Sequence, residues 1–305
     1  MANPNQISSS AIHPFQTTFS VPIDCSSCVT TLHNALTAVP GMVSFSADKD
    51  RQLVHVTGTA APSAIVTAIQ STGKDAILRG SGGGGAGAAA VCILETQISR
   101  SERDKEVDIP AGVDEASSVR GLARMVQVVP VSSPTGETDQ APRTLVDLTL
   151  RGVRAGRYHA SIRQAGDISR GAASTGSIWD AVRKAAGLTS PSSSAGHSAS
   201  TSSESIPREE LLKGYIGTVD VEQGGAGSAF LDCEFGVSEV IGRGMVVSQA
   251  KVVSEGETFK GSEESTVVGV IARSAGVWEN EKTVCSCSGK SVWEERKEQL
   301  SRGMV

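Results

Sequence analysis

The sequence lacks three features: an excess of basic residues, a long apolar run and a recognisable leader. Lys and Arg number 28 against 33 Asp and Glu, which gives a net charge of −5, so no positive field favours nucleic acid. No stretch approaches the ~18 consecutive apolar residues of a membrane helix. The opening MANPNQISSSAIHPF has neither a basic nor an apolar signal region, so no secretory signal is expected. We therefore expect a cytoplasmic protein with no nucleic-acid or membrane partner.

Cysteine is present but unevenly used. Four of the six cysteines form two close pairs near opposite ends of the chain, Cys25/Cys28 and Cys285/Cys287. In a reducing compartment such pairs are more often metal-binding or catalytic than structural disulfides. Cys92 and Cys233 are isolated within β-rich runs, and we expect both to be small buried hydrophobic residues.

Residues 15–80 carry the pattern of one α/β unit. Alternating apolar residues predict a first strand, and a helix with apolar residues at near 3.6 spacing follows and ends at Pro40–Gly41. A hairpin around the turn ADKD, a second helix over 62–71 and a short strand, DAILRG, complete the unit. The order βαββαβ is the ferredoxin-like arrangement, so the first domain is predicted to be α+β.

The rest of the chain changes character. Residues 81–90, SGGGGAGAAA, predict a flexible glycine-rich linker. From 91 to 275, short β-rich runs separated by Gly, Pro and Ser predict an all-β sandwich or barrel. Within it, the Ser-rich segment 187–207 has too few apolar groups to offset its ordering entropy. Residues 276–305 form a predicted C-terminal tail, in which SVWEERKEQL is compatible with a short helix.

The stretch DCSSCVTTLHNAL leaves the role of Cys25 and Cys28 open between metal carriage and dithiol redox chemistry. Cys25 lies in the turn after a strand and Cys28 in the first turn of a helix, where the helix dipole should lower the pKa of both thiols. Two close thiolates suit a soft ion such as Cu(I). A thioredoxin-type unit is disfavoured, because a ~65-residue βαββαβ pattern is too small and has another strand order.

Here a resemblance adds to the pattern. Residues 15–80, with their strand, CxxC loop, helix, VxFxxD hairpin and final TGKDAILRGSG, resemble the heavy-metal-associated domain of copper chaperones, whose loop reads MxCxxC. The resemblance implies a copper site at Cys25 and Cys28. The methionine of the family falls on Ile23, and in the family that side chain packs under the loop rather than binding metal.

Residues 156–180 and the stretch VIGRGMVVSQ, 240–249, resemble segments of copper/zinc superoxide dismutase, which implies a Greek-key barrel of that type. The family's metal ligands fall on non-ligating residues, and its disulfide cysteines on Ala172 and Val268. The positions of the missing histidine ligands are Ser161, Arg163, Ile178 and Ser248. Since zinc needs about four suitable ligands and copper redox chemistry several imidazoles, we expect no dismutase activity.

What the resemblance retains is a scaffold. In the family, the loops that contain Gly166 and Asp167 and the segment with Ile241 and Gly242 help form the dimer face. Their presence here implies recognition of an authentic copper/zinc superoxide dismutase, bound as a heterodimer in place of its own second subunit. Homodimer formation through the same face stays open, as does a degenerate barrel kept only for folding.

The second cysteine pair lies in VCSCSGKSVWEERK. One intervening residue brings both sulfurs of Cys285 and Cys287 within reach of one soft ion, and a disulfide between them would be strained and easily exchanged. Incidental exposed thiols, or one half of a Cys₄ zinc site completed by Cys25 and Cys28, are the alternatives. The zinc site is disfavoured, because it would join a flexible tail to a domain beyond a glycine linker.

Taken in order, the CxxC domain, the ligand-stripped dismutase domain and the CxC tail resemble the copper chaperones for superoxide dismutase in their fungal form. The resemblance implies delivery of Cu(I) to immature dismutase and help with its disulfide, without enzyme activity. It also implies a second pool in the mitochondrial intermembrane space. Two other hypotheses stay open from the residues alone: a thiol-disulfide oxidoreductase with copper incidental, and a zinc-holding scaffold.

Overall fold

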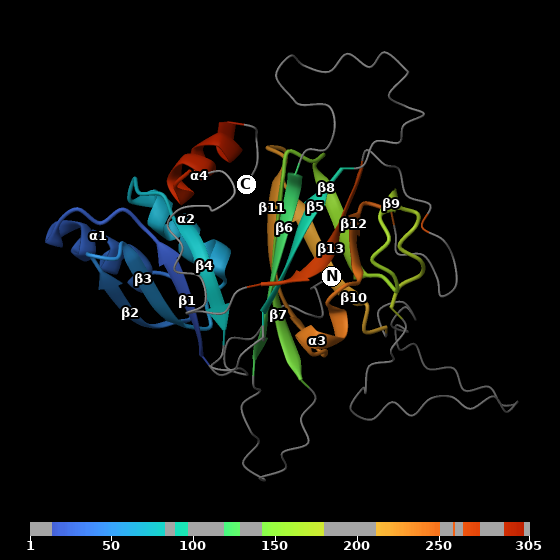
Figure 1. Cartoon of the computed structure of the whole chain (residues 1–305), viewed down its shortest axis with the longest axis horizontal. Helices are drawn as coiled ribbons and strands as arrows, with labels where there is room; N and C mark the ends of the chain where they lie inside the picture. Colours follow the sequence, from blue (N-terminus) through green and yellow to red (C-terminus); the bar gives the residue numbers. More distant parts are fainter. Residues whose placement is uncertain are drawn as a thin grey trace, which may run out of the picture.

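The structure is a computed structural model of the 305-residue chain, in which two bodies lie side by side (Figure 1). It describes residues 14–82, 89–96, 119–128, 142–179, 212–250, 259, 265–274 and 290–301. The second thiol pair, Cys285 and Cys287, lies outside these ranges, as does the Ser-rich segment 187–207.

The first body is the predicted βαββαβ unit, referred to below as the α/β unit. Its strands form one antiparallel sheet in the order β2-β3-β1-β4, and Phe19 of the central strand lies opposite Val54 and Leu78. Both helices contribute buried apolar residues to a core that they share with the sheet. The elements are β1 (Phe15–Ser20), α1 (Ser26–Thr37), β2 (Met42–Asp48), β3 (Leu53–Gly58), α2 (Pro62–Ser71) and β4 (Ile77–Gly82).

The second body is a nearly closed antiparallel barrel of eight strands in the order β10-β8-β12-β13-β5-β6-β7-β11. The ends of this order, β10 and β11, are joined by a hairpin in which Glu222 N–H donates to Ala226 C=O at 2.9 Å. The strands are β5 (Ala89–Glu95), β6 (Val119–Val128), β7 (Arg143–Arg151), β8 (Gly156–Ile162), β10 (Tyr215–Val221), β11 (Ala226–Cys233), β12 (Gly244–Ser248) and β13 (Thr266–Arg273). Strand β9 (Ser169–Ala172) and helix α3 (Val237–Val240) lie outside this sheet. The predicted fold class, α+β followed by all-β, is confirmed.

The predicted linker at 81–90 differs from the structure at both ends. Strand β4 runs on through Gly82, which pairs with Gln16, and β5 already begins at Ala89. Sheet pairing uses backbone N–H and C=O groups, so glycine composition does not prevent a strand from continuing. Six residues, 83–88, therefore separate the end of β4 from the start of β5 along the chain.

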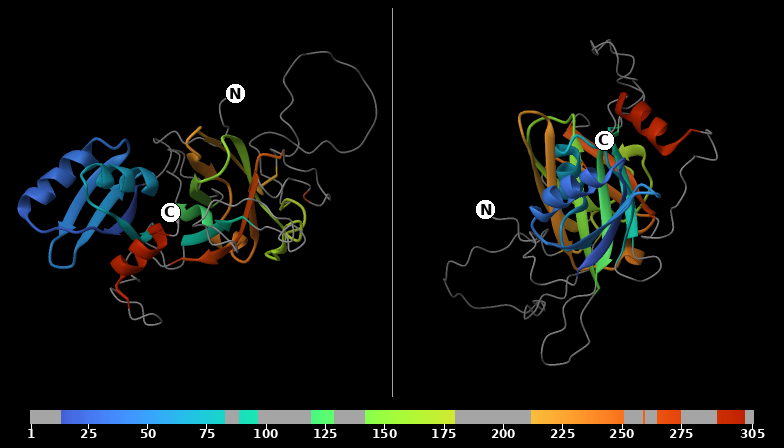
Figure 2. Two further views of the ribbon diagram at one scale, coloured as in Figure 1. Left: turned by 90° about the horizontal axis from the view of Figure 1, so that it is seen from above. Right: turned by 90° about the vertical axis from the view of Figure 1, so that its left-hand side faces the viewer.

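One helix follows the barrel. Helix α4 (Val292–Ser301) agrees with the short helix compatible with SVWEERKEQL, and it lies beside the α/β unit in the three ribbon views (Figures 1 and 2). Its Ser291 N–H donates to the Glu294 carboxylate at 2.8 Å, which is one half of a capping box. None of the helices within the described ranges has the length and apolar character needed to cross a bilayer.

Candidate metal-binding site

The CxxC loop places two thiols together at the N-terminus of α1. Cys25 is the N-cap residue, with extended backbone, and Cys28 is the third residue of the helix. Their Sγ atoms are 3.0 Å apart, and the Ser27 hydroxyl lies 2.9 Å from Cys25 Sγ. Cys25 is exposed and Cys28 half-buried. The loop therefore presents a pair of free sulfurs on an accessible surface, as a soft ion carried by two thiolates requires.

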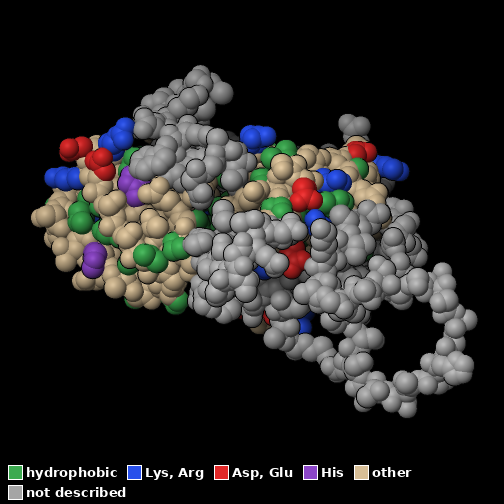
Figure 3. Space-filling model, turned by 90° about the horizontal axis from the view of Figure 1, so that it is seen from below, with side chains coloured by type: hydrophobic (Ala, Val, Ile, Leu, Met, Phe, Trp, Pro, Cys, Tyr) green, Lys and Arg blue, Asp and Glu red, His purple; other side chains and the backbone are tan. Residues whose placement is uncertain are grey.

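The local polar groups favour a thiolate on Cys28. Its hydrogen bond with the Cys25 thiol, and then those with the backbone at Asp24 and Cys25, lower the pKa of Cys28 to about 7. Lys74 Nζ contributes in the same direction and lies 4.0 Å from the Asp24 carboxylate. The direction agrees with the expectation for Cys28, but hydrogen bonds are the main cause. Figure 3 shows Lys and Arg side chains interspersed with Asp and Glu at this end of the α/β unit.

The loop rests on a fixed support. Ile23 is fully buried in the core of the α/β unit, so it fills the space under the loop as the resemblance implied. The Gln52 side chain holds the Ile23 backbone from both sides: its Oε1 accepts from Ile23 N–H at 2.7 Å, and its Nε2 donates to Ile23 C=O at 2.8 Å. The same Nε2 donates to Lys49 C=O at 2.9 Å.

Sequence reasoning missed two residues of this site, Gln52 and Lys74. Gln52 has φ 56°, in the left-handed region that few side chains adopt, but φ is not readable from the turn sequence DKDRQ. Lys74 follows the glycine that ends α2, and no spacing rule links it to Cys28, which lies 46 positions earlier. Both reach the loop only through the fold of the sheet.

The barrel positions that the resemblance aligns with dismutase metal ligands carry serine, arginine and isoleucine side chains. Ser161, Arg163, Ile178 and Ser248 are all buried. The Arg163 guanidinium donates through Nε and Nη2 to Gly176 C=O, at 3.1 and 2.6 Å, and burial lowers its pKa to about 10. Ser248 Oγ lies 2.8 Å from Thr266 Oγ1. A guanidinium cannot ligate a metal, and here it holds the segment around Gly176 instead.

The structure also places the positions of the family's disulfide and the two isolated cysteines. Ala172 and Val268, where the family has disulfide cysteines, lie in one small apolar cluster with Val246, so packing replaces the covalent link. Cys92 and Cys233 are both buried in the barrel core, as predicted, and burial raises the pKa of Cys92. Within the ranges that the structure describes, no three His, Cys, Asp or Glu side chains are grouped to hold a metal.

The predicted docking residues come together on the barrel, in what we call the docking segment (Gly166, Asp167, Ile241 and Gly242). A Cβ on Gly166 would overlap Gly242 C=O, so the two loops touch through their backbones. The next contact along them is Gly244 N–H to Ala165 C=O, at 2.9 Å. Asp167 is exposed, and its hydrogen bonds from Ser169 lower its pKa. Gly242 has φ +82°, so the turn needs glycine.

Comparisons with known proteins extend over both bodies. Residues 18–75 match the family model of the heavy-metal-associated domain. The "Superoxide dismutase 1 copper chaperone" of Saccharomyces cerevisiae is 36% identical over 291 residues, which cover 95% of this chain and 97% of the relative. The protein of the same name from Debaryomyces hansenii is 38% identical over 292 residues, covering 95% and 98%. The "Copper chaperone for superoxide dismutase" of Mus musculus is 26% identical over 289 residues, covering 91% and 88%.

Solved structures also match part of this chain, and one of them carries a related name. It is "The apo form of HMA domain of copper chaperone for superoxide dismutase", with 25% identity and a TM-score of 0.24, and the match covers 28% of this chain and 87% of that one. The relatives therefore align with both bodies, whereas the family model covers the α/β unit alone.

Proposed function

Because this chain belongs to the family of copper chaperones for superoxide dismutase, we propose that it carries Cu(I) on Cys25 and Cys28 and hands it to immature copper/zinc superoxide dismutase. The protein acts as a chaperone and not as an enzyme, as the names of its relatives indicate. The observation that carries the metal assignment is the accessible thiol pair, with its Sγ atoms 3.0 Å apart and the pKa of Cys28 lowered to about 7.

The preference for Cu(I) follows from the ligand chemistry. Thiolates are soft ligands, and two of them on one loop suit a monovalent soft ion that needs few ligands. Zinc takes about four ligands in structural sites, and the described residues offer no third group beside the pair. The exposure of Cys25 gives an incoming thiolate access to the ion, so copper can pass by exchange of one ligand at a time.

The barrel serves as the docking module in this proposal. Its docking segment is exposed or half-buried at Gly166, Asp167 and Gly242, and it needs no bound metal to keep its shape, because Arg163 holds the neighbouring Gly176 carbonyl. We propose that this face binds one subunit of the immature dismutase as a heterodimer. A homodimer through the same face would compete with the client for it.

The C-terminal pair completes the proposed cycle on the basis of sequence. Cys285 and Cys287 receive copper by thiolate exchange and pass it to the client. A disulfide between them would oxidise two client thiols by thiol–disulfide exchange, in which the client gains the disulfide and the CxC pair is reduced to two thiols. We propose the cytoplasm as the site of action, with a second pool in the mitochondrial intermembrane space, as the family resemblance implies.

The test is Cu(I) titration of the purified chain together with activation of metal-free dismutase. Cys25→Ser/Cys28→Ser should lose one copper site, and Cys285→Ser/Cys287→Ser should block activation. Ser26→Ala, in the same loop but without a thiol, is the matched control and should behave as the unmodified chain. Full activation by the C-terminal variant would remove the transfer role of the tail. Disulfide formation in the client under strict copper chelation would favour the oxidoreductase alternative, which the relatives do not support.

A further inference from the structure

The outer face of the barrel is buried over part of three neighbouring strands. Side chains on β7 alternate between the two faces of the sheet, and Val146, Leu148 and Leu150 point into the barrel core. Leu145 and Asp147 therefore point outward, yet each is only 1% exposed. Strands β6 and β11 add outward-facing apolar groups beside them. Val126, Val128, Leu145 and Phe230 form one cluster with Phe15 of β1.

This cluster shows that the α/β unit covers the barrel wall. Phe15 begins β1, but it packs against barrel residues and not within the core of its own unit. Helix α2 also contacts β7, and β4 contacts β6. The apolar contact thus excludes water around the Asp147 carboxylate, which lies on this wall.

Asp147 makes its hydrogen bonds across the junction. Its Oδ1 accepts from the Ser63 hydroxyl at 2.6 Å, and its Oδ2 accepts from Ser63 N–H at 2.9 Å. Arg124 of β6 lies 3.4 Å from Oδ2 and supplies the balancing charge. Burial raises the pKa of Asp147, and these donors oppose that shift. A buried carboxylate with three donors is satisfied only while the two bodies stay together.

Helix α2 of the α/β unit has no N-terminal capping group of its own, and Asp147 provides one. Helix α2 begins at Pro62 with Ala61 as its N-cap, so it has no capping side chain, and no acidic residue lies in its first turn. Ser63 is its second residue, and its N–H is one of the first-turn N–H groups that have no partner within the helix. The barrel carboxylate meets that N–H and the positive end of the helix dipole. It therefore caps α2 from the other body.

We propose that Asp147 is a positioning residue that, with Ser63 and Arg124, forms an interdomain latch and fixes the copper-binding unit on the barrel. The apolar cluster around Phe15 supplies contact area, and the latch supplies direction, because two hydrogen bonds to one residue define an orientation. The inference rests on the proposed function only in what is positioned, namely the Cys25–Cys28 pair.

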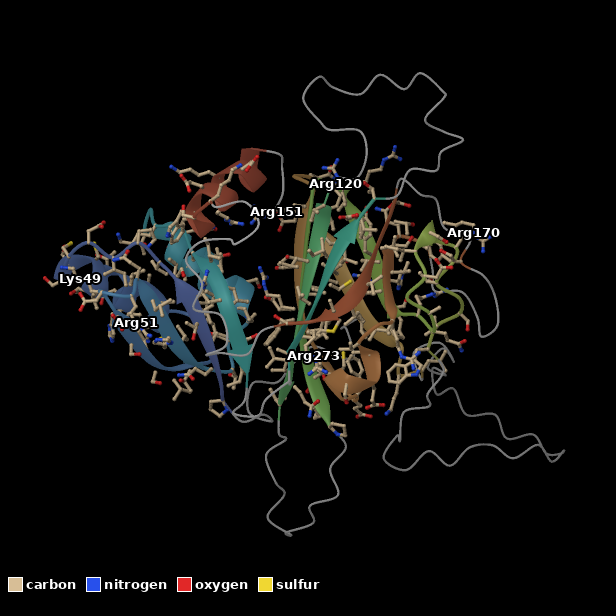
Figure 4. All side chains as sticks on the ribbon, in the orientation of Figure 1. Lys49, Arg51, Arg120, Arg151, Arg170 and Arg273 are labelled. Atoms are coloured by element: carbon tan, nitrogen blue, oxygen red, sulfur yellow. The ribbon has the colours of Figure 1, made fainter. Side chains whose placement is uncertain are left out.

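The latched arrangement decides where the thiol pair lies. Gln52 links Lys49 to the CxxC loop, and Lys49 lies at the outer end of the α/β unit, whereas Arg170 of β9 lies at the opposite end of the molecule (Figure 4). Arg170 N–H donates to the Ser174 hydroxyl, near the docking segment. The latch therefore holds Cys25 and Cys28 away from a client on that segment. Direct contact between the two would require the latch to open.

Helix α4 adds to the same junction. Its Arg296 Nε lies 3.6 Å from the Asp75 carboxylate of the α/β unit. Asp75 adjoins Lys74, which reaches Cys28. Helix α4 is thus attached to the unit that carries the CxxC pair, so the latch positions α4 and the CxxC pair on the same side of the barrel.

The test compares the tumbling of the two bodies in the full chain, by backbone ¹⁵N relaxation without copper or client. The unmodified chain should show one rotational correlation time for α/β-unit and barrel amides. Asp147→Ala should give faster tumbling of the α/β unit than of the barrel. In Asp147→Asn, whose side-chain oxygen can still accept from Ser63, the difference in tumbling between the two bodies should lie between those of the unmodified chain and Asp147→Ala. Asp232→Asn removes a carboxylate from a barrel ion pair with Arg143 and is the matched control, with no expected change.

Two further readouts keep the outcomes separable. Ser63→Ala tests the latch from the other side and should also uncouple the bodies, which covers the case that Asp147→Ala does not fold. Separate tumbling in the unmodified chain, or coupled tumbling in both Asp147→Ala and Ser63→Ala, overturns the latch. Copper affinity should be equal in all variants, since the CxxC loop is untouched; a loss would mean that Asp147 acts on the metal site. Failure of the proposed function would leave the tumbling result unchanged.

Discussion

The Gln52 clamp on Ile23 gives the sharpest quantitative prediction. Gln52→Ala removes three side-chain hydrogen bonds, two to the Ile23 backbone and one to Lys49 C=O. Each contributes on the order of 1 kcal/mol net, and the buried groups of Ile23 lose their partner. We expect the free energy of unfolding of the α/β unit to fall by about 2–3 kcal/mol. Copper affinity at Cys25 and Cys28 should fall as well, because the Ile23 backbone under the loop is no longer held in place.

A second substitution separates the contribution of the hydrogen bonds to stability from the cost of the left-handed backbone. Gln52 has φ 56°, and a residue with a Cβ pays roughly 1–2 kcal/mol to adopt the left-handed region. Gln52→Gly loses the same hydrogen bonds but removes this strain, so it should be about 1 kcal/mol more stable than Gln52→Ala. Gly is therefore the matched control for the loss of the side chain.

The assay is hydrogen exchange at the Ile23 amide in the full chain, with Cu(I) affinity measured by competition against a chromophoric chelator. A loss of 2–3 kcal/mol corresponds to exchange about 30- to 150-fold faster. An Ile23 amide that exchanges at the same rate in Gln52→Ala and in the unmodified chain would refute the clamp. A Gly variant less stable than the Ala variant would refute the argument from backbone strain.

Two other predictions address the thiols and the docking segment. Alkylation of Cys28 should reach half its maximal rate near pH 7, because the thiolate is the reacting form and the pKa is about 7. Below that pH, protons compete with Cu(I) for the sulfur, so the affinity for Cu(I) should fall as the pH falls. A midpoint near pH 9, the ordinary thiol value, would contradict the site geometry. Gly166→Ala should abolish co-elution with metal-free dismutase, because its Cβ would overlap Gly242 C=O and separate the two loops. Gly224→Ala, where nothing lies within 4 Å, is the control, and retained binding by the Gly166 variant would exclude the docking segment as the contact face.

Periodicity and spacing carried much of the fold prediction. Strand alternation and 3.6 spacing in residues 15–80 are local properties, so they predicted βαββαβ before any contact was known. The helix over 62–71 coincides with α2, and the buried Ile23 agrees with its predicted packing. Cys25 and Cys28 are three positions apart at the start of a predicted helix, and the first turn of that helix brings their sulfurs together. The missing dismutase ligands were predicted in another way, from the residue types at the positions that the resemblance aligned with the family's ligands.

Other features depend on residues distant in sequence, and only the tertiary structure decided them. Phe15 continues the alternation of β1, and nothing local says that it packs against barrel residues. Asp147 interrupts the apolar run RTLVDLTLR, as a polar residue on a solvated face would, yet it is buried and caps α2 across 84 positions. Gln52 and Lys74 reach the CxxC loop from other elements. A sequence pattern reports which face of a strand is apolar, whereas what covers that face depends on how two separately folded bodies meet.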